Sequence, residues 1–240
     1  MIFGAILAGG TGTRMGNIEK PKQFLLLGDK PIIIHTIEKF YINNSFEKII
    51  VLCPKNWIKY TEDLINKYIT NSDSLNNSDK IEVIEGGNLR NETIMNAISY
   101  IETNYKLTDE DIIVTHDSVR PFITHRILTE NIKYAAEYDA CDTVIPATDT
   151  IVETKDNKFI SNIPNRKNMF QGQTPQSFKI NKIKTLYNKI SDKEKHMLTD
   201  ACKIFSINNK KVFLIEGEVT NIKITYPHDL KVANSILKGY

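Results

Sequence analysis

Short apolar runs alternate with longer amphipathic segments through the first two-thirds of the chain, and this alternation constrains the fold more than any other feature. Each apolar run is bounded by turn or polar residues, as buried strands are, and the runs cover residues 2–7, 48–53, 81–84, 111–115 and 141–145. The intervening segments predict helices at residues 32–40, 55–68, 90–101 and 125–138. Since strands that alternate with helices build βαβ units, we predict a three-layer α/β fold with a mostly parallel sheet.

The composition fits one domain that covers residues 1–240, because no shift in composition marks a second folding unit. Hydrophobic residues make up 41% of the chain and charged residues 25%, which excludes global disorder. The net charge of +2, with lysines scattered among acids, argues against a nucleic-acid-binding surface. No apolar run is long enough to span a bilayer, so we expect neither a membrane nor nucleic acid as a partner.

The three cysteines, Cys53, Cys141 and Cys202, are far apart and have no histidine or second cysteine at metal-ligand spacing. We therefore recognise no metal cluster and expect reduced core thiols in a cytoplasmic protein. Residues 71–80, NSDSLNNSDK, are polar and without periodicity, which predicts a surface loop.

The pattern changes after Pro146, where two β-prone runs predict a hairpin. The runs cover residues 149–154 and 158–161, and Lys155-Asp156-Asn157 separates them. A hairpin that projects from an α/β sheet leaves a strand edge exposed, and a second copy of the chain is the simplest cover for that edge. We therefore predict that residues 146–166 form a β-arm for dimerisation.

The first predicted strand leads into a glycine-rich loop, Leu7-Ala8-Gly9-Gly10-Thr11-Gly12-Thr13-Arg14-Met15-Gly16. Where side chains are missing, backbone N–H groups can close around phosphate oxygens. The loop is not a Walker A motif, because no Gly-Lys-Ser/Thr follows, and Met15 breaks the pattern G-x-G-x-x-G. A flexible strand-to-helix turn is the alternative for such a loop alone. Arg14 and Lys22 add a bidentate guanidinium and an ammonium point charge, which favours a triphosphate site.

A second candidate segment, His116-Asp117-Ser118-Val119-Arg120-Pro121, follows the apolar run at residues 111–115. It therefore lies at the carboxyl end of a strand, where open α/β sheets bind their ligands. Asp117 could hold Mg²⁺ or another divalent cation through oxygen, while Arg120 faces the charge of a second substrate. An Asp–Arg pair that stabilises a turn is the alternative. We expect a structural role for His116.

A third candidate segment combines Gly86-Gly87 at a strand end with Arg90-Asn91-Glu92-Thr93 at a helix start. Glycines, a cation, a hydroxyl and a helix N-terminus suit a nucleotide. The polar segments 171–176 and 221–225 lie beside β-prone runs, and we expect loops there.

No Ser-His-Asp or Cys-His arrangement for a nucleophile is recognisable in the sequence. This fits a reaction in which a phosphate monoester attacks the α-phosphorus of a nucleoside triphosphate. The second pKa of a phosphate monoester is about 6, so it is ionised near neutral pH and needs no general base. The protein then positions the reactants and neutralises charge.

An ordered set of motifs across almost the whole chain resembles the cytidylyltransferases that activate sugar-alcohol phosphates. The motifs are LAGGTGTRMG, PKQFL, GG-x-x-RNET, HDSVRPF, an ATDT hairpin, GQTPQSF, LTDA and NIKIT. The resemblance implies the nucleotide-diphospho-sugar transferase type of α/β sheet, a protruding β-arm and a homodimer. It also implies CTP and a polyol phosphate as substrates, Mg²⁺ as the cation, and release of pyrophosphate.

The resemblance and the three segments together assign roles to individual residues. Catalytic contacts to the triphosphate fall on Arg14, Lys22 and Lys223. Nucleotide binding falls on Leu7, Ala8, Gly9, Gly10, Gly12, Thr13, Gly86, Arg90, Thr93 and Asp117, of which Asp117 is also the metal ligand. Acceptor binding falls on Arg120, Thr150, Arg166, Thr174 and Thr199, with Thr150 and Arg166 reaching across a dimer.

Two groups of these enzymes are close, namely those that use D-ribitol 5-phosphate and those that use 2-C-methyl-D-erythritol 4-phosphate. The ribitol group is the nearer resemblance, because Ser118-Val119 stands where the methylerythritol enzymes usually show two alanines. The motifs RNET, GQTPQSF and FITHR also resemble those of the ribitol group. It implies CDP-ribitol for teichoic-acid-type polymers and a reductase as pathway partner. The methylerythritol enzyme of isoprenoid synthesis is the alternative, and a non-catalytic nucleotide-binding module is the hypothesis from another class.

Overall fold

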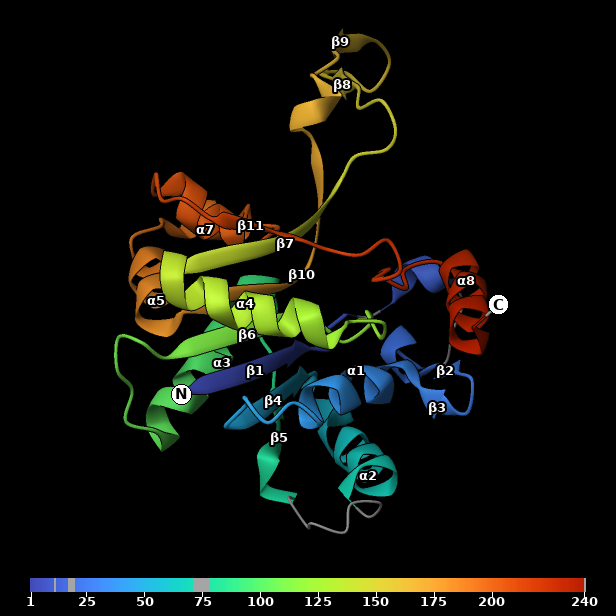
Figure 1. Cartoon of the computed structure of the whole chain (residues 1–240), viewed down its shortest axis with the longest axis vertical. Coiled ribbons are helices and arrows are strands. Elements are labelled where there is room, and N and C mark those ends of the chain that lie inside the picture. Colours follow the sequence, from blue (N-terminus) through green and yellow to red (C-terminus); the bar gives the residue numbers. More distant parts are fainter. Residues whose placement is uncertain (11, 17–19, 71–77, 240) are drawn as a thin grey trace.

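A computed structural model describes residues 1–10, 12–16, 20–70 and 78–239, and Figure 1 shows a central sheet flanked by helices. Seven strands form this sheet in the order β11-β7-β10-β6-β1-β4-β5. Their bounds are β1 Ile2–Leu7, β4 Lys48–Cys53, β5 Ile81–Glu85, β6 Ile112–Asp117, β7 Ala140–Pro146, β10 Phe170–Lys179 and β11 Phe213–Glu216. Only β10 pairs antiparallel with its neighbours in this described sheet, so the prediction of a mostly parallel sheet is confirmed.

Two hydrophobic cores lie on opposite faces of the sheet, which confirms the three-layer arrangement. One core contains α1 (Ile32–Tyr41), α2 (Ile58–Tyr68) and α4 (His125–Tyr138). The other contains α3 (Arg90–Asn104), α5 (Ile180–Asn188) and α7 (Cys202–Ile207). Because neighbouring side chains of a strand point to opposite faces, β1 gives Phe3 and Ala5 to one core and Ile6 to the other.

Two further helices complete the described chain. The short α6 (Asp192–His196) precedes α7. Helix α8 (Pro227–Lys238) packs on the small hairpin of β2 (Leu26–Leu27) and β3 (Lys30–Pro31), with Leu27 and Ala233 buried between them. This packing brings the end of the chain close to the segment that follows the glycine-rich loop.

All five strands and all four helices expected from the sequence are present, with shifts at their ends. The helix predicted at residues 55–68 begins with a 3-10 turn, Lys55–Trp57, before α2. The strand predicted at residues 111–115 continues as far as Asp117. The loop predicted at residues 71–80 falls outside the described residues except for Ser78–Lys80, which form a 3-10 turn.

The loop predicted at residues 171–176 is wrong, because this segment lies within β10. Its residues 173–176 are buried: Gln176 is fully buried, and its carbonyl oxygen accepts a bond of 2.8 Å from the Thr115 hydroxyl. The register against β7 shifts between Gly172 and Gln176, where Pro175 has no N–H to donate. A strand whose buried side chains are largely polar carries no apolar signal. Residues 221–225, by contrast, are irregular as predicted.

The chain between β7 and β10 projects from the body, as expected for the protruding β-arm of the predicted fold (Figure 1). The antiparallel strands β8 (Glu153–Thr154) and β9 (Ile160–Asn162) are shorter than the predicted runs. The apolar side chains of Val152, Phe159 and Ile163 are more than half exposed there. Exposed apolar residues on an extended segment favour a contact surface. The homodimer itself stays a prediction.

The cysteines are unpaired, as expected: Cys53 and Cys141 are buried and Cys202 is partly buried. Burial raises the pKa of the Cys141 thiol to about 12, so this thiol is neutral. Among the described residues, none of the helices combines the length and the apolar character needed to cross a membrane.

Candidate active site

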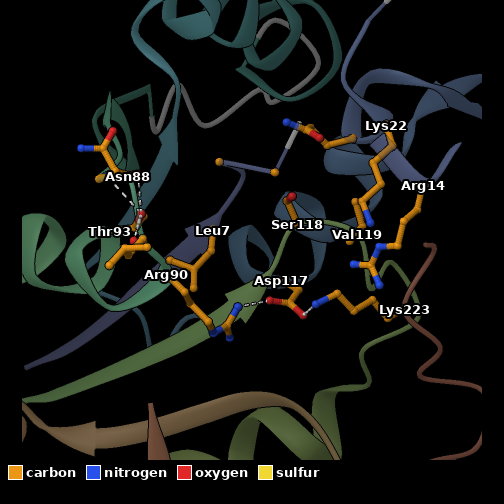
Figure 2. Close-up of a pocket in the computed structure, with 15 residues that line it drawn as sticks. Leu7, Arg14, Lys22, Asn88, Arg90, Thr93, Asp117, Ser118, Val119 and Lys223 are labelled. Atoms are coloured by element: carbon orange, nitrogen blue, oxygen red, sulfur yellow. Dashed lines mark hydrogen bonds and ion pairs between the residues drawn. The ribbon is translucent and has the colours of Figure 1, made fainter. Parts of the chain in front are cut away.

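The carboxyl ends of β1 and β6 open into a pocket of about 320 Å³. Its walls come from the glycine-rich loop, the turn at Lys22, the start of α3, the end of β6 and the loop that carries Lys223 (Figure 2). The structure thus brings the three candidate segments together in one place. Nine of the predicted residues line this pocket: Leu7, Gly9, Gly10, Arg14, Lys22, Arg90, Thr93, Asp117 and Lys223.

The Asp117 carboxylate is the electrostatic centre of the pocket. Arg90 Nη1 pairs with its Oδ1, while Lys223 Nζ lies 2.9 Å and Arg120 Nε 3.6 Å from its Oδ2. Burial alone would raise the pKa of Asp117, but the charges of Arg90, Lys223 and Arg120 outweigh burial and hold this pKa well below its usual value. Asp117 is therefore an anion throughout the neutral range. Its pairing with Arg120 shows that the turn-stabilising alternative describes part of its role.

Three cationic side chains converge beside this carboxylate, as Figure 2 shows for Arg14, Lys22 and Lys223. The Lys22 ammonium is buried and donates a hydrogen bond of 2.9 Å to the carbonyl oxygen of Ile224. Burial, together with the charges of Lys223 and Arg14, lowers the pKa of Lys22 to about 8. Cations held this close repel one another, so a polyanion that enters the pocket relieves their repulsion.

The glycine-rich loop leaves open space on the pocket side. A Cβ atom added at Gly9 or Gly10 would meet nothing within 4 Å, so packing within the protein does not explain these glycines. Gly12 begins the 3-10 turn Thr13–Met15 with a φ of 76°, a backbone conformation that glycine adopts without strain. The buried Gln23 anchors the loop, because its Nε2 donates a bond of 2.7 Å to the carbonyl oxygen of Ala8. Gln23 also lines the pocket, and we had not predicted it.

The opposite wall is the segment between β5 and α3. The N–H groups of Asn88 and Leu89 donate to the Glu92 carboxylate at 3.0 and 3.2 Å, and the N–H of Gly87 donates to the Thr93 hydroxyl at 3.0 Å. Side chains at the start of α3 therefore hold the shape of this wall. Gly87, Ser118 and Val119 also line the pocket, and they belong to the candidate segments without an assigned binding role. Asn88 and Leu89 line it as well and were not predicted; they are the two unspecified positions of the motif GG-x-x-RNET, which was the available signal.

A comparison with protein families matches residues 2–239 to IspD, described as 2-C-methyl-D-erythritol 4-phosphate cytidylyltransferase. The chain belongs to this family. It is therefore a nucleotidyltransferase of the cytidylyltransferase class, for which CTP is the nucleotide substrate. The expectations of an enzyme and of a CTP-binding α/β fold are confirmed.

Solved structures with related names share the fold of this family member. A 4-diphosphocytidyl-2C-methyl-D-erythritol synthase from Anaerococcus prevotii is 26% identical, with a TM-score of 0.77 over 99% of this chain and 96% of that chain. The 2-C-methyl-D-erythritol 4-phosphate cytidylyltransferase of Francisella tularensis is 24% identical, with a TM-score of 0.77 over 98% of both chains. That of Thermus thermophilus is 20% identical, with a TM-score of 0.72 over 99% and 100%. Each of these names describes a methylerythritol enzyme, the group given above as the alternative.

A second pocket, of about 550 Å³, lies at the root of the arm and shares Lys223 with the first pocket. Arg120 lines it and donates a hydrogen bond of 2.8 Å from Nη1 to the carbonyl oxygen of Asn221. Gln171, Gly172 and Gln173 of β10 form another wall. A cavity that meets the first pocket at a lysine is suitable for a second, anionic substrate.

The other predicted residues do not line the first pocket. Ala8, Gly12, Thr13 and Gly86 belong to the segments that shape it. The remaining four acceptor-type residues are separated from one another. Arg166 is on the arm and donates a hydrogen bond of 3.0 Å to the carbonyl oxygen of Thr148. Thr150 and Thr199 are exposed, and Thr174 is buried behind Asp117.

A polar cluster on the far side of Arg90 was missed in the sequence. Within the part of the chain that the structure describes, Asp142, Asp200 and Cys202 form the one group with ligand atoms close enough for a metal ion, all within 4.8 Å of one another. Gln176 Nε2 already bridges the two carboxylates at 3.0 and 2.7 Å. Burial raises the pKa of Asp142 to about 7, with a contribution from the charge of Asp200. These features fit a carboxyl pair that holds a proton and stabilises the sheet.

The close contact of Gly87 with α3 predicts a specific loss of stability in Gly87→Ala. The new Cβ would lie 2.5 Å from Glu92 Cβ and 2.9 Å from backbone atoms of Glu92 and Thr93, so the loop would have to move. We expect a loss of about 1–3 kcal/mol in the free energy of unfolding, measured by urea titration without nucleotide. Gly86→Ala is the matched control, because its Cβ would come no closer than 3.4 Å to Thr93. Equal losses in the two variants would contradict this account.

Proposed function

We propose that the enzyme transfers the cytidylyl group of CTP to D-ribitol 5-phosphate and releases CDP-ribitol and pyrophosphate. The convergence of Arg14, Lys22 and Lys223 on the pocket supports transfer from a triphosphate. The position of Gly172 and Gln173 in the wall of the second pocket supports the ribitol acceptor, because both belong to the motif GQTPQSF, which carries part of the ribitol resemblance. With 20–26% identity to the solved enzymes named above, the acceptor contacts are free to differ.

The chemistry requires positioning and charge neutralisation. An oxygen of the acceptor phosphate forms a bond to the α-phosphorus, and the bond from the α-phosphorus to the bridging oxygen of the β-phosphate breaks, so that pyrophosphate leaves. Negative charge accumulates on the oxygens around the α-phosphorus, where Arg14 and Lys22 stabilise it. Lys223 lies on both pockets and can therefore neutralise the acceptor phosphate as it approaches.

The donor set of the pocket fits a divalent cation such as Mg²⁺. Asp117 supplies one ionised carboxylate at the pocket wall, and Mg²⁺ in nucleotide sites is held by one or two carboxylates together with phosphate oxygens. Bound there, Mg²⁺ would neutralise triphosphate charge. Asp117 would hold the cation while Arg90 keeps the carboxylate in place from its other oxygen.

The second pocket is the place we propose for the acceptor. Arg120 and Lys223 offer positive charge to its phosphate, and Gln171 and Gln173 offer hydrogen-bonding groups to its hydroxyls. The arm of a second copy, with Thr150 and Arg166, would close this pocket in a homodimer. The product would supply activated ribitol phosphate for a teichoic-acid-type polymer, and a reductase would supply the acceptor.

A direct assay decides between the two acceptors. Purified enzyme with CTP and Mg²⁺ is given D-ribitol 5-phosphate or 2-C-methyl-D-erythritol 4-phosphate, and pyrophosphate release is measured. We expect the higher kcat/KM with ribitol 5-phosphate. A higher kcat/KM with the methylerythritol substrate would assign the enzyme to isoprenoid synthesis, and binding of CTP without turnover of either would favour the nucleotide-binding module.

Lys22→Ala tests the role of the buried ammonium. Removal of a preorganised charge at the transition state costs about 10²–10³-fold in kcat, and we expect a loss of this size. Lys20→Ala is the matched control, because Lys20 is exposed and bonds the Tyr60 hydroxyl outside the pocket. Circular dichroism should show both variants folded. A similar kcat for the two variants would remove Lys22 from the mechanism.

The lowered pKa of Lys22 predicts a pH limit to activity. The ammonium is charged below about pH 8 and loses its proton above it, so kcat/KM for CTP should fall as the pH rises through about 8. Lys22→Arg replaces it with a guanidinium that stays protonated, and the falling limb should move to higher pH even if the maximum activity is lower. If the limb stays in place in Lys22→Arg, another group is responsible for it.

A further inference from the structure

A buried chain of hydrogen bonds lies directly behind Asp117. His116 precedes Asp117 in β6, is fully buried, and packs its ring against Phe40 with the ring centres 5.5 Å apart. Since adjacent side chains of a strand point to opposite faces, His116 points away from the pocket that Asp117 lines. His116 therefore has no access to a ligand in that pocket and does not act as its acid or base.

The partners of His116 determine where its proton lies. Its Nε2 is 3.1 Å from the carbonyl oxygen of Arg120, and a carbonyl oxygen only accepts, so Nε2 carries the proton. With the proton on Nε2, the buried ring of His116 has its Nδ1 lone pair available to accept. The Thr174 hydroxyl, 2.9 Å away, must then donate to Nδ1. That same hydroxyl oxygen accepts the N–H of Asp117 at 3.1 Å.

The direction of every bond in this chain is therefore fixed, and the chain joins both ends of one turn. It begins at the N–H of Asp117, passes through Thr174 and His116, and ends at the carbonyl oxygen of Arg120. The N–H of Arg120 closes the turn with a bond of 3.1 Å to the carbonyl oxygen of Asp117. Thr174 belongs to β10, so the antiparallel strand is tied to the turn that presents the Asp117 carboxylate.

We propose that His116 and Thr174 are positioning residues, which hold the turn 117–120 so that the Asp117 carboxylate and the Arg120 guanidinium face the substrates. This assignment rests on the proposed cytidylyl transfer. The Thr174 hydroxyl, expected from the sequence to bind the acceptor, is engaged instead with two groups of the protein. A shift of a positioned group by about 1 Å can cost on the order of 10²-fold in rate, so a small movement of this turn is sufficient to impair turnover.

Four single variants separate the bonds in the chain. His116→Gln keeps a donor near the Nε2 position for Arg120 and loses the acceptor for Thr174. His116→Asn keeps an acceptor near the Nδ1 position and loses the donor. Thr174→Val removes the hydroxyl with little change in shape, and Thr174→Ser restores it.

The variants are compared by kcat and KM for CTP with the preferred acceptor and by the affinity for CTP with Mg²⁺ in calorimetry. We expect Thr174→Val and His116→Gln each to lower kcat/KM by about 10- to 100-fold, and Thr174→Ser to stay within about 3-fold of the wild type. His116→Asn tests the bond to the Arg120 carbonyl oxygen. Loss of this bond should raise the KM for the acceptor. The double variant Thr174→Val/His116→Gln should lose little more than the worse single variant, because both remove the same bond.

Two results would overturn the proposal. One is a folded Thr174→Val enzyme with wild-type kcat/KM and wild-type CTP affinity. The other is a double variant whose losses multiply as those of independent residues do.

A spectroscopic measurement on the wild type holds even if every variant misfolds. The ¹⁵N shifts of the His116 ring at pH 7.5 should show protonated Nε2 and unprotonated Nδ1, and a proton on Nδ1 would refute the assignment. The measurement of CTP affinity also separates this proposal from the proposed function. If neither polyol phosphate is turned over, the reaction is wrong, while weaker CTP binding in Thr174→Val and recovery in Thr174→Ser would still establish the positioning role.

Discussion

The rest of the site depends on one buried carboxylate that is outnumbered by its cations. Asp117 meets Arg90, Lys223 and Arg120, which come from three separate parts of the chain. A buried charge is tolerated when its partners compensate for desolvation. Here three cationic side chains meet one carboxylate, so positive charge is in excess. The surplus, together with Arg14 and Lys22, makes the pocket selective for polyanions. The same pairing holds the Arg90 and Lys223 side chains in position before a ligand arrives.

The sheet makes this arrangement possible. β1 and β6 are parallel neighbours, with Leu7 opposite Asp117 in the register, so the glycine-rich loop and the Asp117 turn leave the sheet side by side. Hydrophobic cores on both faces hold these two strands, and Phe3, Ile6, Ile113 and Val114 among them are fully buried. Loops that leave a rigid sheet edge can hold ligand-binding groups with little loss of entropy on binding.

Much of this was predictable from the sequence, and the exceptions have physical causes. Buried parallel strands need apolar side chains on both faces, and the five apolar runs were therefore visible. β10 was not, because Gln176 and Ser177 are buried through hydrogen bonds rather than by apolar character. Within the site, charged residues such as Arg14, Lys22 and Asp117 were found from their motifs. Asn88 and Leu89 were missed because their position depends on the shape of a loop, and Gln23 because its structural bond to Ala8 joins distant residues.

The antiparallel strand has a mechanical consequence. β10 starts at the root of the arm with Phe170 and reaches the back of the pocket at Thr174, only four residues later, where its pairing with β7 changes register. Because the arm and the wall of the pocket share this strand, a displacement of the arm has a short path to the wall. A partner whose binding to the arm shifts β10 would alter the affinity of the pocket for nucleotide. By thermodynamic reciprocity, bound nucleotide would alter the affinity of that partner for the arm to the same extent. If a second copy of the chain binds through the arm, assembly and substrate binding are then thermodynamically coupled.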